Sequence, residues 1–114
     1  MKEHRNIMVK GNIEKIDFLY YTELFAIRNN LNGFVRNGQV DRLYIEAEGD
    51  KEQLDELEQY LAVSPLSKYI ESIDARAGEM QHFDDFKVIH QKSSSSTKKT
   101  IKGKLLTYIH NWFS

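Results

Sequence analysis

The stretch "GFVRNGQVDRLYIEAEG", from Gly33 to Gly49, predicts two strands joined by a tight turn. We expect short strands over Phe34 to Asn37 and over Arg42 to Gly49, on either side of this turn. The Asn37-Gly38 pair is a turn signal, because both residues tolerate positive φ. In the second strand the alternation predicts one buried face and one polar face.

A helix is predicted on each side of this hairpin. Phe18 to Leu31 has apolar residues at mixed three and four spacing, which is typical of an amphipathic helix. Asp17 precedes it and can cap its first N–H groups, and residues 29–33 supply asparagines and a glycine suited to positive φ at its end. Asp50 to Val63 carries leucines on one stripe and a solvated run of acids on the other, and Ser64-Pro65 ends it.

Three further strands complete the pattern. His4 to Gly11 alternates, and Lys68 to Arg76 and Phe83 to Ile89 have strand composition. Strand, helix, strand, strand, helix, strand is the split β-α-β order of ferredoxin-like folds. We therefore expect an α+β fold with two helices on one face of an antiparallel sheet, extended by one more strand.

The composition fits a single soluble domain. The chain has 114 residues, 40% of them hydrophobic and 29% charged. It has no cysteine, which excludes disulfides and thiolate metal sites. No segment reaches the roughly 20 apolar residues that span a bilayer, and no signal peptide is evident, so we expect a cytoplasmic protein.

The charge divides the chain into a body and a tail. Residues 91–114 hold five lysines and no acid, whereas the first 90 residues hold eleven basic and seventeen acidic residues. Four consecutive serines within "KSSSSTKK" are typical of a flexible linker. We expect a domain over residues 1–90, a Ser/Lys-rich linker over 91–98 and a basic amphipathic segment over 99–114.

The basic tail has three interpretations. Its apolar residues fall on one helical face, although Gly103 weakens the helix; they are Ile101, Leu105, Tyr108, Ile109 and Trp112. Residues 98–114 would then be an extension without a fixed structure, a helix that docks on the sheet or on a neighbouring molecule, or a helix on a membrane surface. Lysine with Trp and Phe suits the last of these.

Several residues together resemble the acylphosphatase family over roughly residues 5–90. They occur in order and at family spacing: Gly11, Ile13, Ile16, Phe18, Ala26, Leu31, "GFVRN" (Gly33–Asn37) and "IEAEG" (Ile45–Gly49). The resemblance implies hydrolysis of carboxyl-phosphate bonds in small acyl phosphates, with no metal, no cofactor and no nucleic acid. In that family the first loop cradles the phosphate with backbone N–H groups, an Arg opening the first helix clamps it, and an Asn orients the attacking water.

Only part of the family's site is present in this sequence. The resemblance implies a catalytic Asn37 and a phosphate loop made of Gly11, Asn12, Ile13, Glu14, Lys15 and Ile16. However, Leu19 occupies the position of the clamping Arg, and it can neither donate a hydrogen bond nor neutralise charge. Loss of a phosphoryl-transfer arginine costs on the order of 10³-fold in rate. Carboxylates at Glu14 and Asp17 would also repel a bound phosphate.

Each site residue also has a purely structural interpretation. Asn37 is a good turn residue, Gly11 can begin an ordinary strand-to-helix connection, and Leu19 can pack in the core. Tyr20 and Tyr21 can pack or line an altered pocket.

Two further chemical possibilities follow from the residue types. The Lys15 ammonium could swing over the loop as a partial substitute for the Arg. The four histidines form no helical pair, so we expect no metal site.

Together these features predict an acylphosphatase-like protein that is catalytically impaired or inactive and serves as a binding or interaction module. The alternatives are an active, divergent acylphosphatase and an adaptor that acts through its tail.

Overall fold

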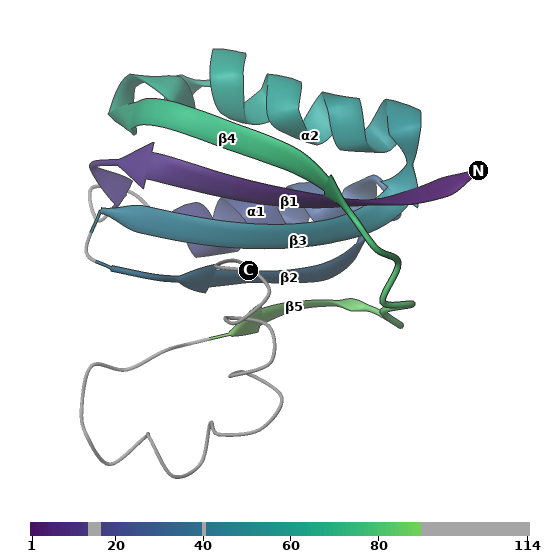
Figure 1. Ribbon diagram of the computed structural model, residues 1–114. Coiled ribbons are helices and arrows are strands. Elements are labelled where there is room, and N and C mark those ends of the chain that lie inside the picture. Colours follow the sequence, from purple (N-terminus) through teal and green to yellow (C-terminus); the bar gives the residue numbers. More distant parts are fainter. Residues whose placement is uncertain (14–16, 40, 90–114) are drawn as a thin grey trace, which may run out of the picture.

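One five-stranded sheet with two helices on one face makes up the fold (Figure 1). The computed structural model describes residues 1–13, 17–39 and 41–89. In chain order the elements are β1 (Lys2–Gly11), α1 (Phe18–Arg28), β2 (Asn32–Asn37), β3 (Arg42–Asp50), α2 (Lys51–Val63), the 3-10 helix η2 (Pro65–Tyr69), β4 (Ile70–Gly78) and β5 (Phe86–Ile89). This order confirms the expected α+β, ferredoxin-like class. The expected linker and tail lie outside the described residues.

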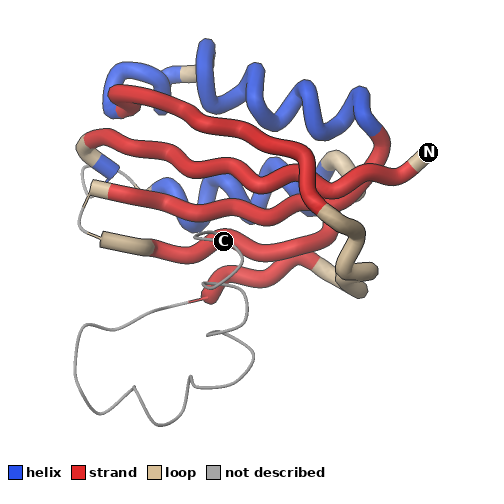
Figure 2. The backbone as a smooth tube through the Cα atoms, viewed as in Figure 1, coloured by secondary structure: helices blue, strands red, loops and turns tan. Residues whose placement is uncertain are grey.

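The sheet is mixed rather than antiparallel. Its strand order is β4-β1-β3-β2-β5, and the pairs β4–β1, β1–β3 and β3–β2 are antiparallel. β5 instead pairs in parallel with β2. The cause is the connection over residues 79–85, which leaves β4 at one edge and reaches β5 at the other edge (Figure 2). Within the described residues, no helix is both long enough and apolar enough to cross a membrane.

Each predicted helix and strand differs from the observed one by one to three residues at its ends, as three of them illustrate. α1 ends at Arg28 rather than at Leu31. The strand expected from Lys68 begins at Ile70, because Ser64 caps a 3-10 helix by accepting a hydrogen bond from the Leu66 amide at 3.2 Å. The last strand begins at Phe86 rather than at Phe83, because the connecting segment still occupies the preceding residues.

The predicted turn chemistry is confirmed after α1 but not in the hairpin. Asn30 has a φ of 59° just after α1, and Gly33 has a φ of 143° at the start of β2. In the hairpin the chain reverses one residue later than predicted: the Gly38 amide donates to the Arg42 carbonyl and the Arg42 amide donates to the Gln39 carbonyl, each at 2.9 Å. Asn37 and Gly38 have no positive φ, so the hairpin is present but the predicted Asn-Gly turn is wrong.

The apolar core lies between the sheet and the helices. Its fully buried side chains come from both layers: Ile7, Val9, Val35, Leu43 and Ile45 from the sheet, and Leu54, Leu57 and Leu61 from α2. Arg5 of β1 binds Asp55 and Glu58 of α2 at 2.7 Å each. These ion pairs fix α2 over β1, so the acidic face of α2 is not entirely solvated.

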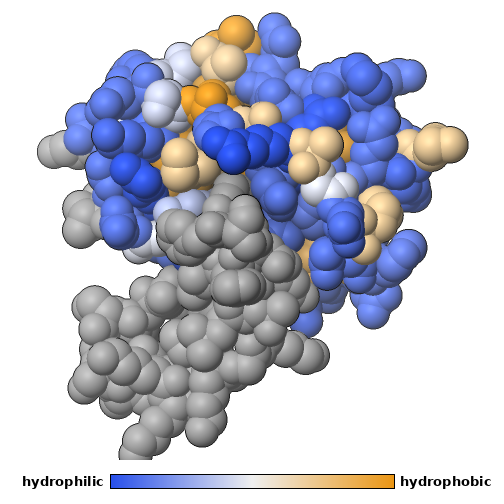
Figure 3. Space-filling model, viewed as in Figure 1, coloured by the Kyte–Doolittle hydropathy of each residue, from blue (hydrophilic) through white to orange (hydrophobic). Residues whose placement is uncertain are grey.

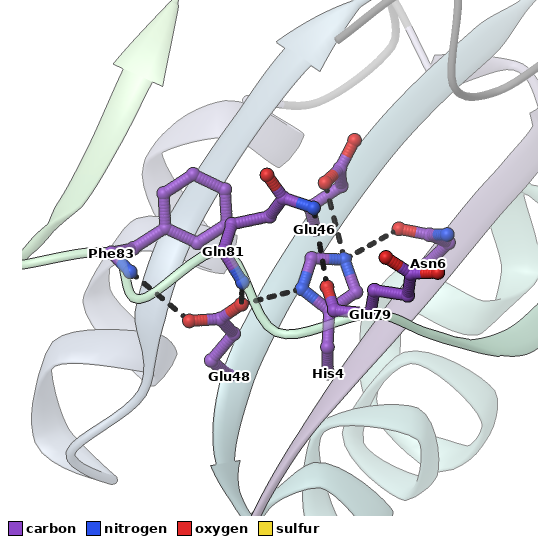
Figure 4. A network of polar contacts seen from close by, with 7 residues as sticks. All are labelled: His4, Asn6, Glu46, Glu48, Glu79, Gln81 and Phe83. Atoms are coloured by element: carbon purple, nitrogen blue, oxygen red, sulfur yellow. Dashed lines mark hydrogen bonds and ion pairs between the residues drawn. The ribbon is translucent and has the colours of Figure 1, made fainter.

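The face of the sheet opposite the helices, called here the open face, is polar but not solvent-exposed in its centre. Tyr44, Glu46 and Glu48 of β3 keep only 5%, 1% and 3% of their surface exposed. Residues 79–85, called here the strap, cover one end of this face through contacts to Glu48 (Figure 4). The part of this face visible in Figure 3 is mainly hydrophilic, with small apolar patches.

Candidate functional site

The start of the predicted phosphate loop and Asn37 lie at the same end of the sheet. Gly11 ends β1, and its amide donates to the carbonyl of Asp41 in the β2–β3 turn at 3.0 Å. Asn37 ends β2 opposite Leu43, which is itself opposite Val9 of β1. Two strand spacings, roughly 10 Å, therefore separate Asn37 from β1.

Gly11 begins the loop where two backbones approach closely. A Cβ at this position would lie 2.1 Å from the carbonyl oxygen of Tyr69, so only glycine fits. The Asn12 amide donates to the same oxygen at 2.8 Å, and Ile13 is buried in the core. The start of the loop is thus tied to η2, and the Asn12 amide is already occupied. Residues 14–16, including Lys15, lie outside the described residues.

Asp17 caps the N-terminus of α1, as predicted. Its Oδ1 accepts a hydrogen bond from the Tyr20 amide at 3.0 Å, and its carbonyl accepts one from the Tyr21 amide at 3.2 Å. The positive end of the helix dipole attracts anions, and here the chain supplies its own carboxylate. A phosphate would have to displace this carboxylate to reach the Tyr20 amide.

Leu19 lies in the first turn of α1 and is half-buried against the core. It also borders a pocket of about 480 Å³ between α1 and β5, lined by Asp17, Leu19, Tyr20, Glu23, Phe86, Lys87 and Val88. The described lining residues therefore include two acids and one lysine. Tyr20 and Tyr21 are exposed, and their rings meet edge to face at 5.2 Å.

Asn37 is exposed at the end of β2, directly before the turn. Its carbonyl accepts a hydrogen bond from Arg36 Nη1 at 3.2 Å. Asn37 is a strand residue without positive φ, so it does not form the predicted Asn-Gly turn, and its water-orienting role stays a prediction.

Sequence reasoning missed a buried ionic network on the open face (Figure 4). His4 of β1 lies between two carboxylates of β3, with Nδ1 2.6 Å from Glu48 Oε2 and Nε2 3.1 Å from Glu46 Oε1. Nε2 is also 2.8 Å from Asn6 Oδ1. Glu48 in turn accepts hydrogen bonds from the strap amides of Gln81 and Phe83. The network therefore holds the strap on the sheet.

The network shifts the pKa values of His4 and Glu48. Burial acts to lower the pKa of His4, but hydrogen bonds to Glu46 and Glu48 outweigh it and raise this pKa to about 9. Burial acts to raise the pKa of Glu48, but the strap amides and His4 outweigh it and lower this pKa. His4 is thus an imidazolium at neutral pH. Strand alternation places these residues on one face, but only the β1–β3 pairing brings them together.

The fold and the connection between β1 and α1 define a class of protein. In this class of ferredoxin-like domains, a strand is followed by a loop and then by a helix whose N-terminus lies at one end of the sheet. The sequence model of the acylphosphatase family matches residues 5–88, and the chain belongs to that family.

Three relatives illustrate how close this similarity is. An acylphosphatase of Archaeoglobus fulgidus is 26% identical over 84 residues, covering 74% of this chain and 94% of that protein. One of Mannheimia succiniciproducens is 30% identical over 87 residues, covering 75% and 97%. The crystal structure of acylphosphatase from Bacillus subtilis superposes with a TM-score of 0.70 at 24% identity, covering 78% of this chain and 99% of that one.

Proposed function

We propose that this protein is a catalytically impaired acylphosphatase that acts as a binding or interaction module. Its ligand would be a small acyl phosphate or another small anion, bound at the loop that begins with Gly11. Family membership supports the ligand class. The residues that open α1 support the loss of catalysis.

The observation that carries the proposal is the pairing of Leu19 with Asp17 at the helix start. Leu19 packs on the core and offers no charge to a phosphate. Asp17 places a carboxylate on the Tyr20 amide, where the developing negative charge of phosphoryl transfer would need a donor. Because phosphoryl transfer depends on positioning and charge stabilisation, both changes act against it.

Lys87 favours a second candidate, an active but divergent acylphosphatase. Lys87 lines the same pocket as Leu19, which stands at the position of the missing arginine. Lys15 is the other cation proposed for this role. A lysine supplies a point charge but not the bidentate fork of arginine, so the rate would still be lower.

Hydrolysis of benzoyl phosphate tests the first proposal. We expect the wild type to match the uncatalysed rate, Leu19→Arg to gain activity and Leu19→Arg with Asp17→Asn to gain more, on the order of 10³-fold in total. Ile27→Arg is the matched control, because it adds the same charge to α1 at a position that is 57% exposed and away from the loop. Adding Asn37→Ala to the active variant should remove the gain.

Two results would overturn the proposal of impaired catalysis. One is a wild type that already hydrolyses benzoyl phosphate well above background; Lys15→Ala and Lys87→Ala would then show which ammonium substitutes for the arginine. The other is equal activity of Ile27→Arg and Leu19→Arg, because the gain would then reflect charge alone.

A further inference from the structure

The open face of the sheet buries large side chains. Phe34 and Arg36 of β2 keep 2% of their surface exposed, and Tyr44 of β3 keeps 5%. The strap explains part of this, because the ring of Phe83 meets Phe34 edge to face, with ring centroids 5.9 Å apart. The strap therefore covers the end of the open face that Phe34 occupies.

Arg36 and Tyr44 lie further from the strap. Arg36 lies two residues beyond Phe34 in β2, and Tyr44 lies two residues before Glu46 in β3. Each of these separations is roughly 7 Å along the strand. The guanidinium carbon of Arg36 lies 4.3 Å from the centroid of the Tyr44 ring, and burial lowers the pKa of Arg36. Neither described helix can cover this pair, because both helices lie on the opposite face (Figure 1).

The chain itself continues from the edge of this same face. β5 ends at Ile89, and Ile89 lies directly beside Arg36 in the parallel register. Residues 90–114 therefore start next to the buried pair. They include the apolar stripe and five lysines, three of which lie within residues 99–113.

We propose that residues 99–113 dock as a helix on the open face, with the apolar stripe over Arg36 and Tyr44 and the lysines toward solvent. A helix of this length is about 22 Å long, which fits along nine-residue strands of roughly 30 Å. Residues 90–98 can span up to ~30 Å, more than the roughly 15 Å from β5 across to β1. The docked helix would be the second layer over the sheet, and its presence does not depend on catalysis.

The test combines one spectroscopic probe and one chemical probe, both applied to the full chain. Trp112 is the only tryptophan, so its fluorescence reports on the tail alone. Hydroxyl-radical footprinting reports on Tyr44, with the exposed Tyr20 of α1 as an internal reference. Leu105→Asp places a charge on the apolar stripe, and the matched Leu106→Asp places the same charge off it. Both positions lie outside residues 1–90, so the folded domain is left intact.

In the wild type and in Leu106→Asp, we expect acrylamide to quench Trp112 several-fold less than in the urea-unfolded chain, and Tyr44 to resist oxidation. Leu105→Asp should raise both the quenching and the oxidation of Tyr44 several-fold, without changing Tyr20. Unchanged oxidation of Tyr44 in Leu105→Asp would overturn the proposal. So would protection of Trp112 that disappears on dilution, which indicates a second copy, or protection that requires vesicles of phosphatidylcholine with phosphatidylserine, which indicates a membrane helix.

Discussion

At the scale of single residues, Asp17 and Leu19 at the start of α1 each have a clear structural role. Leu19 adds apolar surface to the core, and Asp17 satisfies an amide that would otherwise lack a partner in the first turn of α1. Both residues therefore contribute to folding while they work against binding of a phosphate. The sequence alone predicted both roles, because a capping residue and a core position are local properties of the chain.

Two substitutions of Asp17 separate its charge from its cap. Asp17→Asn keeps a capping oxygen and should leave the free energy of unfolding nearly unchanged, whereas Asp17→Ala should lose about 1 kcal/mol. Both should strengthen binding of inorganic phosphate about tenfold, because each removes a negative charge close to the loop. Urea unfolding and calorimetric titration measure the two effects. Equal phosphate affinity in all three proteins would show that phosphate does not bind near this helix end.

At the scale of elements, local signals were enough to locate helices and turns but not to pair the strands. Leucine spacing and the Ser64-Pro65 stop located α2, and Asn37-Gly38 located the hairpin to within one residue. The parallel direction of β5 depends on where the strap crosses, and no residue in β5 encodes that. The same limit hid the ionic network, since alternation in β3 predicts a polar face but not a strap that buries it.

The connection from α1 to β2 offers a paired test of backbone fit. A Cβ on Gly33 would lie 1.8 Å from the carbonyl oxygen of Glu46, so Gly33→Ala must push β2 away from β3. We expect it to lower the free energy of unfolding by about 3 kcal/mol. Asn30 has a φ of 59°, which glycine adopts readily, so Asn30→Gly should change stability by less than about 0.5 kcal/mol. Urea unfolding of both variants measures these changes. Similar losses in the free energy of unfolding would mean that the two positions are equally tolerant.

On the scale of the whole molecule, the two faces of the sheet bury different kinds of side chain. The helix face is an apolar core, and the open face is held by a protonated histidine between two carboxylates. Ionic contacts buried in this way depend on pH, whereas the apolar core does not. The pH dependence of global stability therefore reports on the open face.

His4 should make the protein less stable in alkali. Its pKa is raised to about 9 in the folded state, from about 6.5 in the unfolded chain. A raised pKa contributes stability that is complete below pH 6.5 and is lost as the pH rises through 9, and 2.5 units correspond to roughly 3 kcal/mol. The opposite sign holds for Glu48, whose lowered pKa removes stability as the pH falls through its folded value.

Unfolding by urea between pH 6 and pH 10 measures this alkaline loss. In His4→Asn the loss between pH 6.5 and 9 should be absent. The control is His82→Asn, because His82 lies exposed in the strap with a φ of 60°, which asparagine tolerates. An unchanged alkaline loss in His4→Asn would assign it to another group.

The position of β1 also has a kinetic consequence. Among the strands of this sheet β1 leaves the ribosome first, yet it lies between β3 and β4, and its residue His4 pairs with Glu48 and Gly78. Nearly the whole domain must therefore be synthesised before its first strand can find both neighbours. Such long sequence separations slow folding toward the millisecond-to-second range. Until β4 emerges, an edge of β1 stays unpaired and open to other chains, so early folding of this protein carries a risk of association.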